Sequence, residues 1–200
     1  DSLGNIISPE GTDWTDVADL NYDNTEMRMA MIDAMKYWVT DIGVDGFRCD
    51  VADQVPVDFF KQCIDTLRNT AGREILMLAE GVNKDLFEAG FDLNYGWEFA
   101  AQMRKVYQEG EPATTLFTMN DEEYLGLPQG KMKLRFTTNH DEATKHSPIS
   151  EWCSVRGSMS AFAVILFFPD VPLVYGSQEV GYPEAIDFFR HTSVEWDANP

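Results

Sequence analysis

The sequence predicts an α/β fold built on a parallel sheet, and three observations support this. Short apolar runs alternate along the chain with segments of helical periodicity, as in successive βαβ units. The run over residues 75–79 is continuously apolar, which is typical of a strand covered on both faces of a sheet. An acidic residue lies just past the end of three of these runs. These residues are Asp50, Glu80 and Asp141.

The individual elements follow from periodicity and from end signals. Residues 1–24 carry scattered Gly, Pro, Ser, Asn and Asp, and we expect them to form a loop. Apolar stripes, caps and a favourable Pro56 predict helices over residues 25–40, 56–69, 97–107, 112–124 and 154–168. Apolar runs predict strands over residues 44–49, 75–79, 91–93, 133–137 and 171–175.

Acidic residues at the carboxyl ends of strands favour a (β/α)₈ TIM barrel, which builds its active site at that edge. A doubly wound open sheet also places ligands there, but it normally carries a glycine-rich phosphate loop. The sequence contains no such loop. We therefore predict an α/β fold of the TIM-barrel type.

Composition narrows the choice of partners. The formal net charge of −19 over 200 residues argues against nucleic acid as a partner, because phosphate neutralisation needs a basic surface. No apolar run is long enough to span a bilayer. The three cysteines match no zinc-binding spacing and are expected to be free thiols.

The three acids suggest glycoside hydrolysis, which uses one carboxyl group as an acid and another as a nucleophile or base. Each is weak evidence alone, since an acid at a strand end often forms a turn or a cap. Arg48 precedes Asp50 by two residues, so both side chains are expected on one face of the strand. Glu80 follows an apolar strand, and burial there is expected to raise its pKa. His140 is expected to donate hydrogen bonds to sugar hydroxyls.

These residues resemble the motifs of the α-amylase family of glycoside hydrolases. Gly46-Phe-Arg-Cys-Asp50 is similar to its fourth-strand motif, and Leu78-Ala-Glu-Gly81 to its fifth-strand motif. Thr138-Asn-His-Asp141 resembles the seventh-strand motif, and Val171-Pro-Leu-Val-Tyr-Gly-Ser-Gln-Glu179 the eighth strand. Asp16-Val-Ala-Asp-Leu-Asn-Tyr-Asp-Asn24 resembles the segment before the third helix.

The resemblance implies cleavage of α-glucosidic bonds in starch-like α-glucans with retention of configuration. It makes Asp50 the nucleophile, Glu80 the acid/base and Asp141 the transition-state stabiliser, with Arg48 and His140 as substrate-binding residues. Asp19 matches a position that often ligates a structural calcium ion. One isolated Asp is a poor site for calcium, which prefers six or more oxygen ligands.

The chain also departs from the family pattern. Asp53-Gln54 stand where Lys-His is common. An Arg often follows the seventh-strand Asp closely, whereas Glu142-Ala-Thr-Lys145 follows it here, with Lys145 as a candidate substitute. The third-strand motif is absent, so strands four to eight are expected and one to three are not. We therefore expect residues 25–200 to be part of a catalytic barrel, and residues 1–24 to end an inserted loop domain.

Several alternatives stay open at this level. An α-glucan transglycosylase, or a debranching or neopullulanase-type relative, would carry the same three carboxylates. A non-catalytic carbohydrate-binding barrel is disfavoured because such relatives usually lose a carboxylate. An isolated partial barrel exposes strand edges, so we expect self-association and little hydrolase activity from it. A polymer substrate suggests, by analogy, a location outside the cell or at its envelope.

Overall fold

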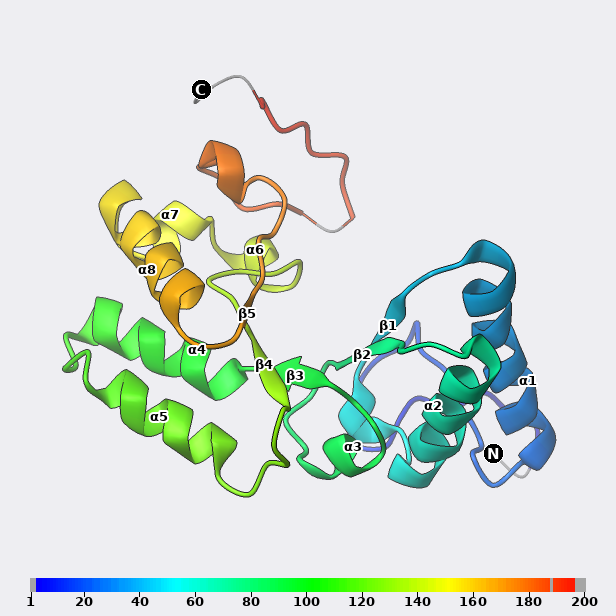
Figure 1. Ribbon diagram of the computed structural model, residues 1–200. Helices are drawn as coiled ribbons and strands as arrows, with labels where there is room; N and C mark the ends of the chain where they lie inside the picture. Colours follow the sequence, from blue (N-terminus) through cyan, green and yellow to red (C-terminus); the bar gives the residue numbers. More distant parts are fainter. Residues whose placement is uncertain (1–2, 188, 197–200) are drawn as a thin grey trace. The chain divides into compact units, whose positions relative to one another are not determined.

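The computed structural model describes residues 3–187 and 189–196 (Figure 1). The chain divides into two compact units, Asp1–Asp92 and Leu93–Pro200. Residues 3–24 contain no helix or strand, which agrees with the loop expected there. Every strand pairing described below is parallel and joins strands consecutive in sequence, so the predicted α/β class with a parallel sheet is confirmed.

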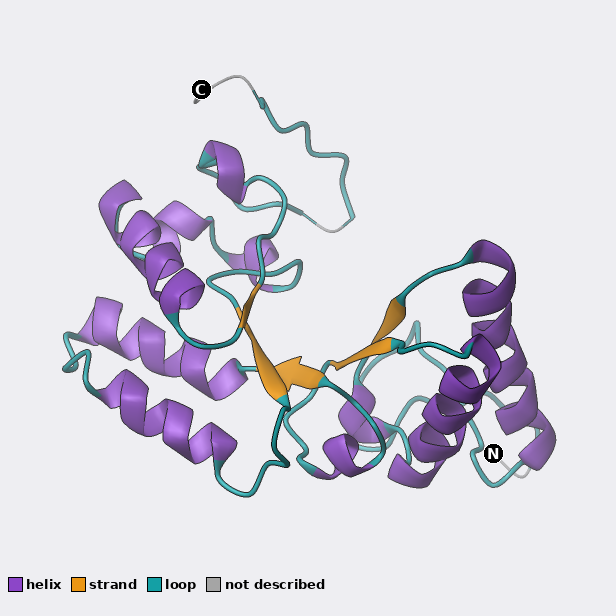
Figure 2. Cartoon of the chain, in the orientation of Figure 1, coloured by secondary structure: helices purple, strands orange, loops and turns teal. Residues whose placement is uncertain are grey.

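Among its described residues, the first unit contains two paired strands and three α-helices. Figure 2 shows the strands in orange and the helices in purple. The strands are β1 (Gly46–Cys49) and β2 (Leu76–Ala79), and the helices are α1 (Thr25–Tyr37), α2 (Val57–Ala71) and α3 (Asp85–Glu88). Cys49 pairs with Ala79 at the carboxyl ends of the strands. Gly46 permits this close approach, because a Cβ there would lie 2.1 Å from the carbonyl oxygen of Leu76.

Helix α2 supplies much of the core of the first unit. Its buried side chains recur at the three- and four-residue spacing of one helix face, and they are Phe59, Phe60, Cys63, Ile64 and Leu67. Helix α1 lies beside α2 (Figure 1). The side chain of Asn24 caps α1 by accepting from the backbone N–H groups of Glu26 and Met27, which satisfies two donors at the helix start.

The described residues of the second unit form three paired strands and five α-helices. The strands are β3 (Leu93–Tyr95), β4 (Met132–Arg135) and β5 (Val171–Pro172). The helices are α4 (Trp97–Arg104), α5 (Thr115–Tyr124), α6 (Glu142–Lys145), α7 (Pro148–Glu151) and α8 (Val155–Phe167). One buried cluster joins α4, α5 and α8, and its members are Phe99, Met103, Leu116, Trp152, Ala161 and Ile165.

Most predicted elements form, with shifted ends. Strand β3 lies two residues later than the predicted 91–93, and β5 is shorter than the predicted 171–175. Helices α1 and α4 each continue into one π-helical turn, Trp38–Ile42 and Lys105–Glu109. The short helices α3, α6 and α7 were not predicted, because a single turn carries too little periodicity to be recognised.

Within the described part of the chain, every helix falls short of the length and apolarity that a bilayer crossing requires.

A buried ionic network ties β4 to α5 in the second unit. The guanidinium of Arg135 is fully buried and pairs with Glu123 and with Asp170, whose carboxylate lies 2.7 Å from Nε. It also donates to Asn120 at 2.8 Å. Burial raises the pKa of Glu123, and the charge of Arg135 opposes that rise. Arg135 therefore compensates two acidic groups that have almost no access to water.

Replacing Arg135 with Ala should destabilise the protein strongly, because two buried carboxylates would lose their counter-charge. We expect a loss of about 3–5 kcal/mol, measured by denaturant unfolding of the protein that carries this chain. Lys61→Ala is the matched control, since it removes only an exposed pair with Asp65 and should cost about 1 kcal/mol or less. Equal losses in the two variants would contradict a structural role for the buried network.

Candidate active site

Three predicted site residues meet at the carboxyl ends of β1 and β2. Arg48 lies on β1, Asp50 directly follows β1, and Glu80 directly follows β2. The Nη1 of Arg48 pairs with the carboxylate of Asp50, and its Nη2 lies 2.6 Å from Oε1 of Glu80. The predicted contact between Arg48 and Asp50 is therefore present, and the same guanidinium also reaches Glu80. Its positive charge offsets the repulsion between the two acids.

The two carboxylates differ in exposure. The side chain of Asp50 is 74% exposed, whereas that of Glu80 is 15% exposed. Glu80 also accepts, through Oε2, a hydrogen bond of 2.8 Å from the backbone N–H of Val51. Glu80 is thus held on both of its oxygens, while Asp50 presents its carboxylate to solvent, where an incoming ligand could meet it.

Asp50 lines a small pocket of about 160 Å³ in the first unit. One wall comes from the loop before α1 and includes Trp14, Asp19 and Tyr22. The other wall follows β1 and includes Val51 and Gln54. The pocket places aromatic surface beside the exposed carboxylate of Asp50.

Two neighbouring groups of Asp50 stay uncharged at neutral pH. Burial raises the pKa of the Cys49 thiol to about 12, so this thiol stays protonated at neutral pH. Burial also raises the pKa of Tyr22, and the nearby charge of Asp19 adds to the rise.

The second unit holds the remaining two predicted site residues. His140 and Asp141 lie between β4 and α6, and the Nε2 atom of His140 is 3.5 Å from Oδ2 of Asp141. Both side chains are about two-fifths exposed, at 40% and 38%. The structure thus gathers the predicted residues into two groups, Arg48 with Asp50 and Glu80 in one unit, and His140 with Asp141 in the other.

A buried polar segment fixes the backbone that carries His140 and Asp141. The Oδ1 atom of Asn139 accepts from the N–H groups of Asp141, at 3.0 Å, and of Glu142, at 2.9 Å. The side-chain amide of Gln178 donates to Oγ1 of Thr137 at 2.7 Å, which ties the segment after β5 to the end of β4. These hydrogen bonds hold the backbone beside the partly exposed side chains of His140 and Asp141.

Lys145 has a local role in this structure. Its Nζ lies 2.9 Å from Oε1 of Glu142, and Arg104 on α4 reaches the other oxygen of Glu142 at 2.6 Å. Arg104 also pairs with Glu151, so it connects α4 to both α6 and α7. Sequence reasoning missed Arg104, because nothing near it in sequence indicates partners 38 and 47 residues away.

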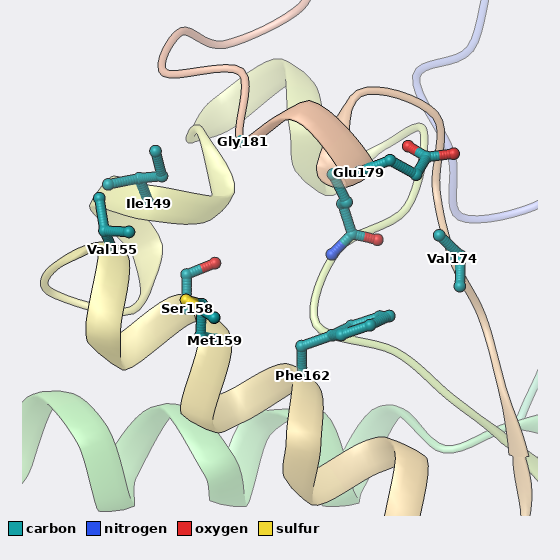
Figure 3. A pocket seen from close by; sticks show the side chains of 9 residues that line it. Ile149, Val155, Ser158, Met159, Phe162, Val174, Glu179 and Gly181 are labelled. Carbon is teal, nitrogen blue, oxygen red and sulfur yellow. The ribbon is translucent and has the colours of Figure 1, made fainter. Parts of the chain in front are cut away.

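A larger apolar pocket of about 370 Å³ lies elsewhere in the second unit (Figure 3). Side chains of α8, including Val155, Met159 and Phe162, line one side of it, and Val174 lies on the other. None of the predicted site residues lines this pocket. Its size alone does not make it the candidate site, since it offers few polar groups that converge on one point.

The predicted calcium ligand Asp19 lines the same pocket as Asp50. Among the described residues, no group of three or more His, Cys, Asp or Glu side chains is arranged to hold a metal ion. A calcium ion at Asp19 would need backbone carbonyls and water for its other ligands, because it prefers six to eight oxygens. The calcium site stays a prediction.

Asp53 is the residue near the candidate site whose contacts the sequence did not reveal. Its Oδ2 accepts from the N–H of Val82 at 2.9 Å, and its Oδ1 accepts from the N–H of Asn83 at 3.0 Å. The sequence identified Asp53 only as a departure from the family pattern. The related feature of the sequence was the glycine at position 81. In the structure, a Cβ on Gly81 would lie 2.2 Å from Oδ1 of Asp53.

The partial burial of Cys49 and the full burial of Cys63 predict a pattern of thiol reactivity. At pH 8 its raised pKa, and the pKa of about 11 of buried Cys63, keep both groups as unreactive thiols. Cys153 is exposed and should be alkylated by iodoacetamide in the folded protein. Peptide mass spectrometry should find label on Cys153 alone until denaturant is added. Equal labelling of Cys49 in the folded state would contradict the described burial.

Comparisons with known proteins connect this arrangement to a family. The sequence model of the α-amylase catalytic domain matches residues 12–198. The chain is 32% identical to α-amylase MalA of Haloarcula japonica over 92% of its length, and 28% identical to a cyclomaltodextrin glucanotransferase of a Bacillus species over 82%. It spans about a quarter of each of these two relatives, 26% and 24%.

Solved structures agree with the sequence comparisons. The crystal structure of the noncanonic maltogenic α-amylase AmyB of Thermotoga neapolitana superimposes with a TM-score of 0.83 at 29% identity, covering 98% of this chain and 44% of AmyB. The α/β architecture is thus that of part of a (β/α)₈ amylase barrel, as predicted. With its family motifs at the ends of β1, β2 and β4, the chain belongs to the α-amylase family of glycoside hydrolases.

Proposed function

We propose that the protein carrying this chain hydrolyses α-glucosidic bonds in starch-like α-glucans by a retaining double displacement. The observation that carries the proposal is the contact of one guanidinium, that of Arg48, with both Asp50 and Glu80. Two carboxyl groups held by one guanidinium lie close together, and a retaining enzyme needs a separation of about 5–5.5 Å. An inverting enzyme needs more room, because a water molecule must fit between them.

In the first step, an oxygen of Asp50 attacks the anomeric carbon of the bound glucose unit. The bond from that carbon to the leaving oxygen breaks, and Glu80 gives its proton to the leaving oxygen. The exposure of Asp50 suits the role of nucleophile, since an incoming ring can reach its carboxylate. The sheltered position of Glu80 suits a proton donor that must be held in place.

In the second step, Glu80 takes a proton from water, and the water oxygen attacks the anomeric carbon. The bond to Asp50 then breaks, and the configuration is the same as in the substrate. Asp141 would stabilise the positive charge that develops on the ring in both steps. His140 would donate a hydrogen bond to a sugar hydroxyl beside it.

Substituting the three carboxylates should abolish turnover while leaving the fold intact. We expect Asp50→Asn, Glu80→Gln and Asp141→Asn each to lower kcat on maltoheptaose by at least about 10²-fold, because each removes a charge or a proton that acts in the transition state. Reducing-sugar release from the purified protein is the measurement. Asp65→Asn on the exposed face of α2 is the control and should match the parent.

The same activity assay tests the role proposed for each carboxylate. Full activity of Glu80→Gln would remove Glu80 from the mechanism, and full activity of Asp50→Asn would remove the nucleophile. The anomer released first, observed by proton NMR, should be α if configuration is retained. Initial release of the β-anomer would contradict the double displacement.

A transglycosylase is the second candidate, favoured by the similarity to a cyclomaltodextrin glucanotransferase. The two activities share the first step and differ in the acceptor of the second step, which is water in a hydrolase and a sugar hydroxyl in a transferase. Debranching and neopullulanase-type activities differ instead in the linkage that is cleaved.

Product analysis should separate these candidates. We expect incubation with maltotriose to give only shorter products, because the proposed acceptor is water. Starch should be degraded faster than pullulan and cyclodextrin. Maltooligosaccharides longer than the substrate, seen by chromatography, would instead identify a transferase. A preference for pullulan would identify a debranching or neopullulanase-type enzyme.

Three further expectations accompany this proposal. A calcium ion at Asp19, a location outside the cell or at its envelope, and self-association of the isolated chain all stay predictions.

A further inference from the structure

We propose that Asp53 is a positioning residue that holds Glu80, the proposed acid/base, through the loop after β2. This inference rests on the proposed function, because it concerns how Glu80 transfers its proton. It concerns contacts between two loops that follow paired strands, residues 51–53 after β1 and residues 80–83 after β2. We call these contacts the strand-end contact.

Four hydrogen bonds make up the strand-end contact. Glu80 receives two of them. The N–H of Val51 donates to Oε2 of Glu80, and the N–H of Ala52 donates to its carbonyl oxygen, each at 2.8 Å. Asp53 accepts the other two, from the N–H groups of Val82 and Asn83 at 2.9 and 3.0 Å. Both the side chain of Glu80 and the backbone around it are therefore tied to the loop that carries Asp50.

The backbone conformation of Val51 supports a structural role for the strand-end contact. Val51 has φ 42 and ψ 45, a left-handed conformation that is unfavourable for a β-branched residue. This conformation accompanies the hydrogen bond from its N–H to Glu80. A strained residue persists only where its surroundings hold it, and such residues cluster at functional sites.

The space beside the carboxylate of Asp53 leaves no room for a side chain at position 81. A Cβ on Gly81 would lie 2.2 Å from Oδ1 of Asp53 and 2.5 Å from its carboxyl carbon. The carboxylate of Asp53 therefore occupies the volume that any larger residue at position 81 would need. Gly81 and Asp53 form a matched pair, and a change in either should move the loop that follows Glu80.

The carboxylate of Asp53 is suited to holding the loop after β2, because of the hydrogen bonds that it can accept. A carboxylate can accept from two N–H groups at once, whereas a Lys side chain has donors only and cannot accept either bond. Lys is common at this position in the family that the chain resembles, where it lines the leaving-group side. In this chain the position is used instead to hold the backbone beside the proton donor.

A misplaced acid should matter only when the leaving group needs a proton. A displacement of about 1 Å can cost up to about 10²-fold in rate. A sugar leaving group is a poor one and requires protonation by Glu80, whereas fluoride leaves without it. The comparison uses kcat/KM, because this ratio reports the step in which the leaving group departs.

The experiment compares maltotriose cleavage with hydrolysis of α-maltosyl fluoride by the protein that carries this chain. We expect Asp53→Ala to lower kcat/KM on maltotriose by about 10–100-fold, and on the fluoride by less than about threefold. Asp53→Asn keeps one acceptor oxygen and should show an intermediate loss. Gly81→Ala should show the same selectivity, because its Cβ displaces the carboxylate of Asp53.

The combination of variants adds an internal control. Once Asp53 is Ala, the clash with Cβ at position 81 is gone, so Gly81→Ala should cost little more in that background. Thermal unfolding midpoints are recorded for each variant. If Asp53→Ala does not fold, Asp53→Asn and Gly81→Ala carry the test.

The outcomes separate this inference from the proposed function. In the first outcome, Asp50→Asn abolishes turnover of both substrates, and the Asp53 variants either lower the two activities equally or leave both unchanged. Asp53 then has no positioning role, and the proposed function stands. If Asp50→Asn leaves both activities intact, the proposed function fails, and the inference fails with it. A selective loss on maltotriose, together with an inactive Asp50→Asn, supports both.

Discussion

The parallel register of β1 and β2 is the constraint on which the candidate site depends. Cys49 pairs with Ala79, so the next residues of the two strands, Asp50 and Glu80, emerge together at one edge. The absence of a side chain at Gly46 allows the close approach of the strands. A shift of one residue would turn one carboxylate to the opposite face of the sheet and away from Arg48.

Beside the paired ends of β1 and β2, the first unit holds Glu80 in place and leaves the carboxylate of Asp50 open to solvent. Glu80 is held by Arg48, by the N–H of Val51 and by the backbone contact with Ala52. Asp50 has Arg48 as its partner and a largely exposed carboxylate. A proton donor must keep its place while a nucleophile must be reached by substrate, and these two environments match the two roles proposed.

Sequence analysis predicted the class of fold, which the structure confirms, and it proposed residues for a candidate site, because apolar runs and strand-end acids are local signals. The contact between Arg48 and Asp50 followed from their spacing on one strand. The second contact of Arg48, with Glu80, was not predicted, since it depends on the register between two strands. The contacts of Arg104 and Asp53 were missed because their partners lie about 30 to 50 residues away in the sequence. The shifted β3 and the single-turn helices show that weak local patterns yield to packing.

The identity of the nucleophile is the central claim, and mass spectrometry of a trapped intermediate tests it most directly. A slow fluoro-substituted glucosyl fluoride would be incubated with the protein and quenched in acid, and the labelled peptide mapped. We expect one glucosyl adduct, on the carboxylate of Asp50, with loss of fluoride. An adduct on Glu80 or Asp141, or turnover of the reagent with no adduct at any time, would contradict the account.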